Sequence, residues 1–199
     1  MAGRDNYDIP VYSPRARFYH WLTAFLILVQ FPIGFYMTYR GYEMAWTNEA
    51  GEAKTGLFDG VTGTLYDSHK LIGLTILAVV LARFIYRLRN GAPPSDPSVP
   101  SALTGIAHGV HWLIYVLLIA VPIGGYIGVS YYGALDAFGL PIPALTAKDE
   151  KFSETIFAAH KFAALALLAL VVLHVAAAIY HRAVRKDRVV ERMLPKKTV

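Results

Sequence analysis

Seven histidines are the residues of this sequence best suited to chemistry, and all of them lie within or at the ends of long apolar segments: His20, His69, His108, His111, His160, His174 and His181. Ionisable side chains are costly inside a membrane and usually serve a function there. Neutral imidazole is a natural ligand for haem iron. The set therefore indicates metal or haem binding, although any single member could instead be a polar contact at the membrane surface.

The spacing of His160 and His174 is the most informative feature. They are fourteen residues apart in one apolar segment. In a helix of 3.6 residues per turn, fourteen residues return to nearly the same face after about 21 Å. Two irons stacked in one helical bundle, one near each membrane surface, would be separated in this way. Each iron then needs a second axial ligand from a facing helix.

Depth in the membrane assigns the second ligands. His69 opens the second apolar segment and matches the depth of His160, so we predict that this pair holds an outer haem. His20 lies near the start of the first segment and best matches His174, which is about two turns from its helix end, so we predict that this pair holds an inner haem. Two histidines fill both axial positions of an iron, which suits electron transfer rather than oxygen binding.

Zinc is the competing interpretation of a histidine-rich chain. A zinc site needs three or four ligands that converge within a few ångströms. Here the histidines are spread over both membrane surfaces, without carboxylate or thiolate neighbours. The sequence has no cysteine, which excludes iron–sulfur clusters, disulfides and haem attached covalently through a Cys-x-x-Cys-His motif.

The remaining histidines are each open to two interpretations. His108 and His111 share a helix face at the start of the third apolar segment, and either could replace one of the four ligands. Our preferred hypothesis is that they form hydrogen bonds and supply protons at a quinone pocket near the inner haem; the alternative is a satisfied polar pair at the membrane surface. For His181, beside Arg182 at the end of the fourth segment, a surface contact is the better interpretation.

Basic side chains near these histidines could bind the haem propionates. The candidates for the inner haem are Arg15, Arg17, Arg83 and Arg87, and those for the outer haem are Lys70 and Lys161, each of which follows a ligand. The alternative is that they serve only to orient the chain in the membrane. Several glycines would let helices or a macrocycle approach closely, as in ordinary membrane packing: Gly34, Gly73, Gly124, Gly125 and Gly128.

Four membrane-spanning helices must position these residues. Hydrophobic residues make up 55% of the 199 residues and charged residues only 17%. Apolar residues fill four blocks, at about 18–39, 69–88, 105–129 and 158–181, each long enough to cross about 30 Å of hydrocarbon. The sequence therefore predicts an all-α, integral membrane four-helix bundle that forms one domain over residues 1–199.

The basic residues predict the orientation of this bundle. Of 19 Lys and Arg residues, three lie in the N-terminal tail (Arg4, Arg15 and Arg17), three around the second connection and seven after His181. The positive-inside rule then places both termini in the cytoplasm, and the net charge of +5 reflects topology rather than nucleic acid binding. No small-residue cleavage site follows the first block, so we expect it to stay as a membrane anchor.

The two outward loops, 40–68 and about 130–157, carry an acidic excess. They contain four basic and nine acidic residues, which would tend to repel an anion. A local funnel made by Lys70 and Lys161 could still attract one, or the acidic surface could dock a basic cytochrome c. An acidic outer surface is also simply what the positive-inside rule leaves behind.

Several motifs together resemble one known family. The first block carries His-Trp-Leu at 20–22, and the second begins at His69 and ends in Arg-x-x-x-Arg-Leu at 83–88. The third reads Gly-Ile-Ala-His-Gly-Val-His-Trp-Leu-Ile-Tyr from Gly105, followed by Ile-Ala-Val-Pro at 119–122. The fourth has its two histidines, Ala-Ala-Ala at 176–178, His181 and then Arg-Met-Leu-Pro at 192–195. From about Tyr12 to Pro195 the chain resembles the bacterial cytochrome b561 family of dihaem membrane cytochromes.

The resemblance implies two haem b groups with iron ligands at His20, His69, His160 and His174, in a multi-pass protein of the bacterial inner membrane. It also implies a quinone, ubiquinone, as redox partner. The expected function is an oxidoreductase that moves electrons between the periplasmic face and the quinone pool, with superoxide as the favoured donor. The alternative is a non-catalytic electron-transfer subunit that docks a periplasmic dehydrogenase or cytochrome c. A transporter or receptor without haem is the third alternative.

Overall fold

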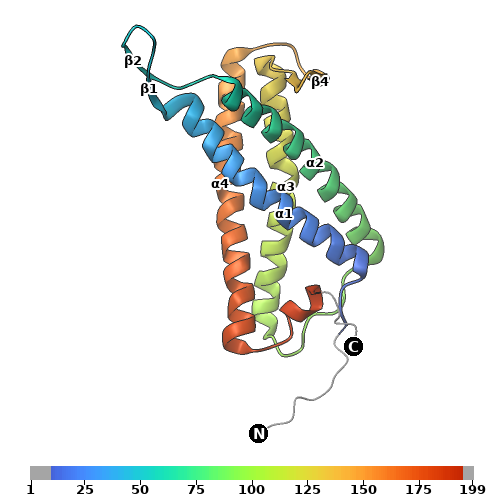
Figure 1. Cartoon of the computed structure of the whole chain (residues 1–199). Coiled ribbons are helices and arrows are strands. Elements are labelled where there is room, and N and C mark those ends of the chain that lie inside the picture. Colours follow the sequence, from blue (N-terminus) through green and yellow to red (C-terminus); the bar gives the residue numbers. More distant parts are fainter. Residues whose placement is uncertain (1–9, 195–199) are drawn as a thin grey trace.

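Four long helices run along one another in the computed structural model, which describes residues 10–194 (Figure 1). They are α1 (Pro14–Thr38), α2 (Gly60–Asn90), α3 (Ser101–Tyr132) and α4 (Glu150–Tyr180). Short π-helical turns extend α1 over Tyr39–Glu43 and α4 over His181–Arg185, and a 3-10 turn covers Val190–Met193. Each long helix has the length and hydropathy of a membrane span. The predicted all-α architecture with four apolar helices is confirmed.

Two small hairpins connect the helices at one end of the bundle (Figure 1). Between α1 and α2, β1 (Ala45–Thr47) pairs antiparallel with β2 (Ala53–Thr55). Between α3 and α4, β3 (Asp136–Ala137) pairs with β4 (Leu140–Pro141). We call this the hairpin end. The opposite, terminal end holds both ends of the described chain, where the Tyr12 N–H donates to the Arg192 carbonyl at 3.2 Å.

Local side chains begin and end the helices where their backbone groups lack partners. Ser13, Asp59 and Asp149 each accept a hydrogen bond from a backbone N–H in the first turn of the helix that follows. Gly133 ends α3 in the left-handed conformation, with φ of 91°, which glycine adopts at little cost. The helices that these caps begin and end therefore extend beyond the predicted apolar blocks.

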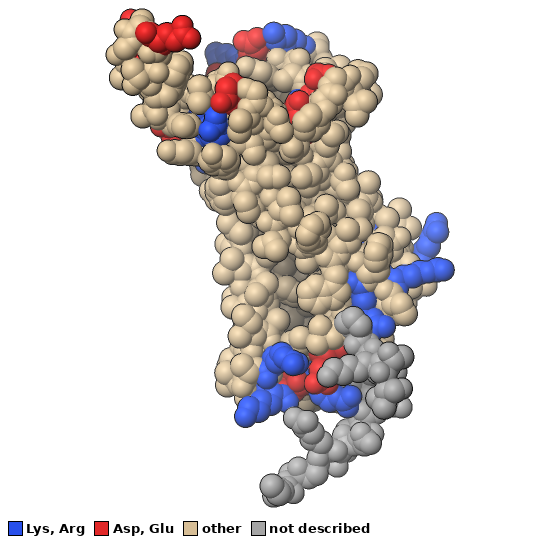
Figure 2. All heavy atoms as spheres, in the orientation of Figure 1, with Lys and Arg blue, Asp and Glu red and all other residues tan. Residues whose placement is uncertain are grey.

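The bundle buries little and exposes much apolar surface. The buried core is one layer that takes side chains from every helix: Ile27, Ile76, Val80, Leu118 and Leu167. Large apolar side chains point outward elsewhere, including Leu28, 73% exposed, and Phe162, 72% exposed. On the face drawn in Figure 2, an uncharged band crosses the middle of the molecule, and charged side chains gather toward both ends. This surface is suited to lipid rather than to water.

The C-terminal segment folds back on the start of α1. The Arg17 guanidinium donates to the Leu194 carbonyl at 2.6 Å, and the Trp21 indole donates to the Met193 carbonyl at 2.9 Å. The Arg192 guanidinium donates to the Pro10 and Pro94 carbonyls. Residues 192–194 of the Arg-Met-Leu-Pro motif thus connect the C-terminal segment to the start of α1 and to the connection between α2 and α3. Four residues used in the sequence analysis lie outside the described residues: Arg4, Pro195, Lys196 and Lys197.

Candidate functional site

The structure brings the four predicted ligand histidines together in two pairs. The rings of His69 and His160 have centroids 6.2 Å apart and planes at 80°, and those of His20 and His174 have centroids 6.2 Å apart and planes at 72°. A metal–nitrogen bond of about 2 Å and roughly 1.1 Å from nitrogen to ring centre would separate two imidazoles across one metal by about 6 Å. Both pairs therefore have the spacing of two axial ligands.

The helix bounds explain why these rings meet. His69 is the tenth residue of α2, and His160 is the eleventh of α4; both helices start at the hairpin end. His20 is the seventh residue of α1, and His174 is the seventh from the end of α4, both counted from the terminal end. Because α1 begins at Pro14, earlier than the predicted apolar block, the depths of His20 and His174 match better than the sequence indicated. The apolar core layer lies between the two pairs, with Leu167 midway between the two histidines of α4.

Helix α3 holds the ring of His160 in place. Its Nδ1 lies 2.9 Å from the carbonyl oxygen of Val121. A carbonyl only accepts, so Nδ1 carries the proton and the lone pair of Nε2 is available for a metal. One turn further along, Gly125 leaves room for the ring: a Cβ there would lie 3.0 Å from His160 Cε1. This outer hydrogen bond is the usual means of orienting a metal-binding imidazole.

Helix α1 approaches His69 in a similar way. A Cβ at Gly34 would lie 3.1 Å from His69 Cε1. The Gln30 side-chain amide donates to the backbone carbonyl of His69 at 2.9 Å. Gln30 was missed in the sequence analysis, although the signal was present: it is an amide inside an apolar span, where polar side chains are costly.

The terminal-end pair has a third histidine and a cation beside it. The ring of His111 lies 5.3 Å from that of His174, closer than two rings on opposite sides of one metal would be. Arg83 Nη2 lies 3.2 Å from His20 Nδ1, and the guanidinium lies over the Tyr115 ring at 5.1 Å. Within residues 10–194, Arg83 forms no ion pair. A positive charge placed there suits an anionic group such as a haem propionate.

The other predicted cations are engaged differently or lie on the surface. Lys70 Nζ lies 2.8 Å from the Asp67 carboxylate and also donates to the Asp136 carbonyl, and its side chain is only 15% exposed. Arg17 is bound to the C-terminal segment, while Arg15 and Lys161 are exposed. Arg87 is partly buried one turn after Arg83. Among the six basic residues predicted to bind propionates, Arg83 is the one with a described hydrogen bond to a predicted haem ligand, His20.

His108 and His181 make polar contacts near the terminal end. His108 is exposed, and its Nε2 lies 3.5 Å from Ser95 Oγ in the connection between α2 and α3. His181 Nδ1 lies 2.6 Å from the Asp187 carboxylate, which also accepts from Arg185 Nε at 3.2 Å. The contacts of His181 are those of a polar cluster rather than of either histidine pair.

The donor set suits a cofactor that brings its own metal ligands. Across the described residues, no group of three or more His, Cys, Asp or Glu side chains could hold a metal ion. A zinc site with three or four protein ligands therefore has no support in this part of the chain. Haem iron has four ligands from its macrocycle and needs only two axial ones, which each histidine pair can provide.

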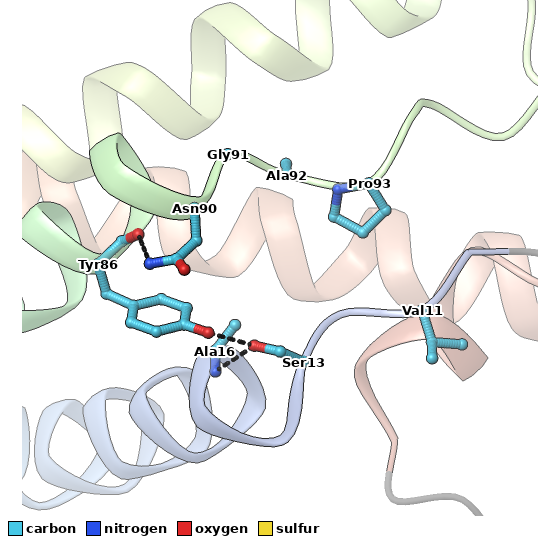
Figure 3. Close-up of a pocket in the computed structure, with 8 residues that line it drawn as sticks. All are labelled: Val11, Ser13, Ala16, Tyr86, Asn90, Gly91, Ala92 and Pro93. Carbon is cyan, nitrogen blue, oxygen red and sulfur yellow. Dashed lines mark hydrogen bonds between the residues drawn. The ribbon is translucent and has the colours of Figure 1, made fainter.

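A separate cavity opens at the terminal end (Figure 3). Its volume is about 400 Å³, and it lies between the start of α1 and the end of α2. The Ser13 hydroxyl and the Tyr86 phenol form a hydrogen bond of 2.9 Å at its wall. None of the seven histidines lines it.

An apolar helical bundle with two stacked pairs of facing histidines has the architecture of a membrane cytochrome. Residues 11–196 match the family described as prokaryotic cytochrome b561, and the chain belongs to that family. It is therefore a multi-pass membrane cytochrome of the b561 type, in a family that implies haem b and electron transport. The family resemblance noted from the motifs is confirmed.

Named relatives cover most of the chain. A protein of Yersinia pestis called "Probable superoxide oxidase CybB" is 36% identical over 131 residues, which cover 65% of this chain and 74% of the relative. "Cytochrome b561 homolog 2" of Escherichia coli is 27% identical over 180 residues, covering 89% and 88%. "Cytochrome b562" of Cereibacter sphaeroides is 25% identical over 175 residues, covering 88% and 89%. All are cytochromes or a redox enzyme by name.

Proposed function

We propose that this chain carries electrons on two haem b groups between the periplasmic face of the inner membrane and the quinone pool, with superoxide as the donor. The observation that carries the proposal is that two pairs of histidines, His69 with His160 and His20 with His174, face each other with ring centroids 6.2 Å apart in each pair. Along α4 their members His160 and His174 are about 21 Å apart by helix rise. Haem b, when bound, supplies an iron that takes up and releases single electrons.

The chain's own residues bind and orient in this scheme. His69 with His160 would hold one haem and His20 with His174 the other, and a haem held by two histidines would carry electrons rather than bind oxygen. Val121 fixes the protonated nitrogen of His160. Arg83 lies beside His20, and its positive charge would bind a propionate of the second haem.

The apolar layer between the two histidine pairs blocks the passage of ions but permits electron tunnelling. Its five buried members are aliphatic and carry no group that could relay a proton. Electrons can tunnel through such a layer over a short gap, whereas a charged side chain or ion inside it would be strongly destabilised. The proposed electron path therefore need not conduct protons across the membrane.

The charge distribution supports an orientation with both termini in the cytoplasm. Basic side chains that include Arg15, Arg87 and Arg182 lie at the terminal end, and the acidic excess lies in the loops of the hairpin end. Under the positive-inside rule the hairpin end then faces the periplasm. The pair His69 and His160 would be the electron entry site, and the pair His20 and His174 would be the exit.

Quinone reduction needs protons, and the terminal end has titratable side chains on the cytoplasmic side in this orientation. His111 lies beside His174, and His108 is one turn earlier on the same helix, next to Ser95. We propose that these two histidines bind ubiquinone and pass protons to it from the cytoplasm.

A second function deserves equal testing because of the ion pairs at the hairpin end. Four cations there are already paired with acids: Arg40 with Asp59, Lys54 with Glu52, Lys70 with Asp67, and Lys148 with Glu150. The pairing of Lys70 weakens the predicted funnel for an anion. The remaining acidic excess suits the docking of a basic periplasmic redox protein, in which case the chain would be an electron-transfer subunit.

Rapid mixing separates the two functions. Oxidised, purified holoprotein is given a superoxide pulse with and without ubiquinone, and haem absorption is followed. We expect fast reduction of a b-type band by superoxide and reoxidation by the quinone. A protein that stays oxidised with superoxide but is reduced by a quinol would contradict the superoxide proposal and support the electron-transfer subunit. Docking would then be tested by measuring how the rate of haem reduction by a basic redox protein depends on salt concentration. A variant with Glu43 and Glu49 changed to Gln should show a weaker salt dependence than the wild type.

A further inference from the structure

Helices α1 and α2 lock together through two glycines, each of which receives a polar side chain from the other helix. A Cβ at Gly34 of α1 would lie 3.1 Å from the ring of His69, and a Cβ at Gly73 of α2 would lie 3.4 Å from Gln30 Nε2. Each glycine is four residues after the polar side chain on its own helix, so the two pairs lie one turn apart on facing surfaces. The helices run in opposite directions, which makes the contact reciprocal.

The amide of Gln30 is only half used in this contact. Its Nε2 donates to the backbone carbonyl of His69 at 2.9 Å, while its Oε1 is buried and has no described hydrogen-bond partner. Nδ1 of His69 is likewise buried without a described partner, and it faces Gly34. Two buried polar atoms of the contact between α1 and α2 are thus without a described partner, and such groups destabilise a fold unless they are bridged.

The facing histidine, His160, shows the hydrogen bond that the Nδ1 of a ligand imidazole makes when it has a partner. Nδ1 of His160 donates to the Val121 carbonyl, four residues before Gly125, the glycine that makes room for the His160 ring. Both histidines of the hairpin-end pair are therefore backed by a glycine on the neighbouring helix. In both cases a residue with an oxygen acceptor precedes that glycine by four positions: Val121, whose carbonyl accepts from His160, and Gln30, whose Oε1 has no described partner.

We propose that Gln30 is a positioning residue for the hairpin-end haem. Its Nε2 anchors the His69 backbone, and one bridging water would let its Oε1 take the proton of His69 Nδ1, which would leave the lone pair of His69 Nε2 available for an iron. An acceptor at Nδ1 makes the imidazole a stronger electron donor and stabilises the oxidised iron. This inference rests on the proposed ligation of haem by His69.

The test measures the midpoint potentials and EPR spectra of purified holoprotein with both haems bound. In Gln30→Met, which keeps the length but removes both hydrogen bonds, the potential of the hairpin-end haem should rise. In Gln30→Glu, which keeps an oxygen acceptor, it should stay at the wild-type value or fall. The haem at His20 and His174 should not change in either variant. The EPR g-values of a low-spin haem depend on the angle between its axial rings, here 80°, so the signal of the hairpin-end haem should shift in Gln30→Met.

Two further variants keep the test decisive. Thr75→Val removes an exposed hydroxyl of α2 that bonds only to its own helix, and it should change neither potential. Gly34→Ala keeps Gln30 but presses on the His69 ring, so it should alter the EPR signal of the same haem even if Gln30→Met loses that haem. Equal potentials and spectra in wild type, Gln30→Met and Gln30→Glu would overturn the inference. If His69→Ala still binds both haems, the ligation proposal itself is wrong, whatever the Gln30 variants show.

Discussion

Gly125→Ala tests how strictly the bundle fixes an axial ligand. The new Cβ would lie 3.0 Å from His160 Cε1 and 3.2 Å from its Nδ1, whereas unstrained carbon contacts lie at about 3.5–4.0 Å. The ring must therefore move by roughly half an ångström or α3 must shift. Overpacking of this kind costs about 1–3 kcal/mol. The hydrogen bond from His160 Nδ1 to Val121, now 2.9 Å long, would also be strained, which adds up to about 1 kcal/mol.

Together these effects amount to about 1–4 kcal/mol, and at about 1.4 kcal/mol per factor of ten they weaken binding of the hairpin-end haem by roughly fivefold to several hundredfold. The assay is the ratio of haem to protein after purification, together with the EPR signal of each haem. The neighbouring Gly124 is the matched control, because a Cβ there would meet nothing within 4 Å, so Gly124→Ala should bind haem normally. If Gly125→Ala and Gly124→Ala have the same haem content and spectra, the proposed role of α3 in holding His160 is refuted.

Three other predictions follow from the same contacts. His69→Ala and His160→Ala should each remove the same haem and leave the other, as read from EPR; loss of different haems would refute the pairing. Arg83→Leu removes the cation beside the terminal-end pair, so the potential of that haem alone should fall, and an unchanged potential would exclude a propionate contact. At the hairpin end, the pKa of Asp59 is lowered to about 2, chiefly by the hydrogen bond from the backbone N–H of Thr62 and further by the Arg40 guanidinium. This carboxylate therefore stabilises the fold above its ordinary pKa of 3.8 and loses that effect as the pH falls toward about 2, so Asp59→Asn should lower the unfolding temperature at pH 6 more than at pH 3.

The sequence predicted the features that depend on periodicity and hydropathy. Four apolar blocks were sufficient to give four helices, because a chain in lipid must satisfy its backbone hydrogen bonds within each span. The fourteen-residue spacing of His160 and His174 led to the same pairs of rings that the structure brings to 6.2 Å. The geometry of one helix relates His160 and His174, and the depth of His69 and His20 in their own spans was sufficient to assign the partners.

Contacts between loops and helices could not be predicted in this way. From the sequence, Lys70 was expected to attract an anion. In the structure its partners are the Asp67 carboxylate, one turn earlier, and the backbone carbonyl of Asp136 in the β3–β4 hairpin, 66 residues later in the sequence. The hairpins themselves are two or three residues per strand, too short to leave a periodic pattern. Gln30 was detectable as a polar residue in a span, but its role depends on the register between α1 and α2.

The two ends of the bundle are built for different tasks under the proposed function. At the hairpin end, each histidine is packed against a glycine of the adjacent helix, and Lys70 is held by its acidic neighbour, so the pair is fixed in position. At the terminal end, the pair has another imidazole 5.3 Å away and a guanidinium without an ion pair among the described residues. One-electron entry needs only a rigid site, whereas reduction of a quinone needs protons and room for a second molecule. If electrons enter at the hairpin end and leave at the terminal end, each set of side chains lies where its chemistry is required.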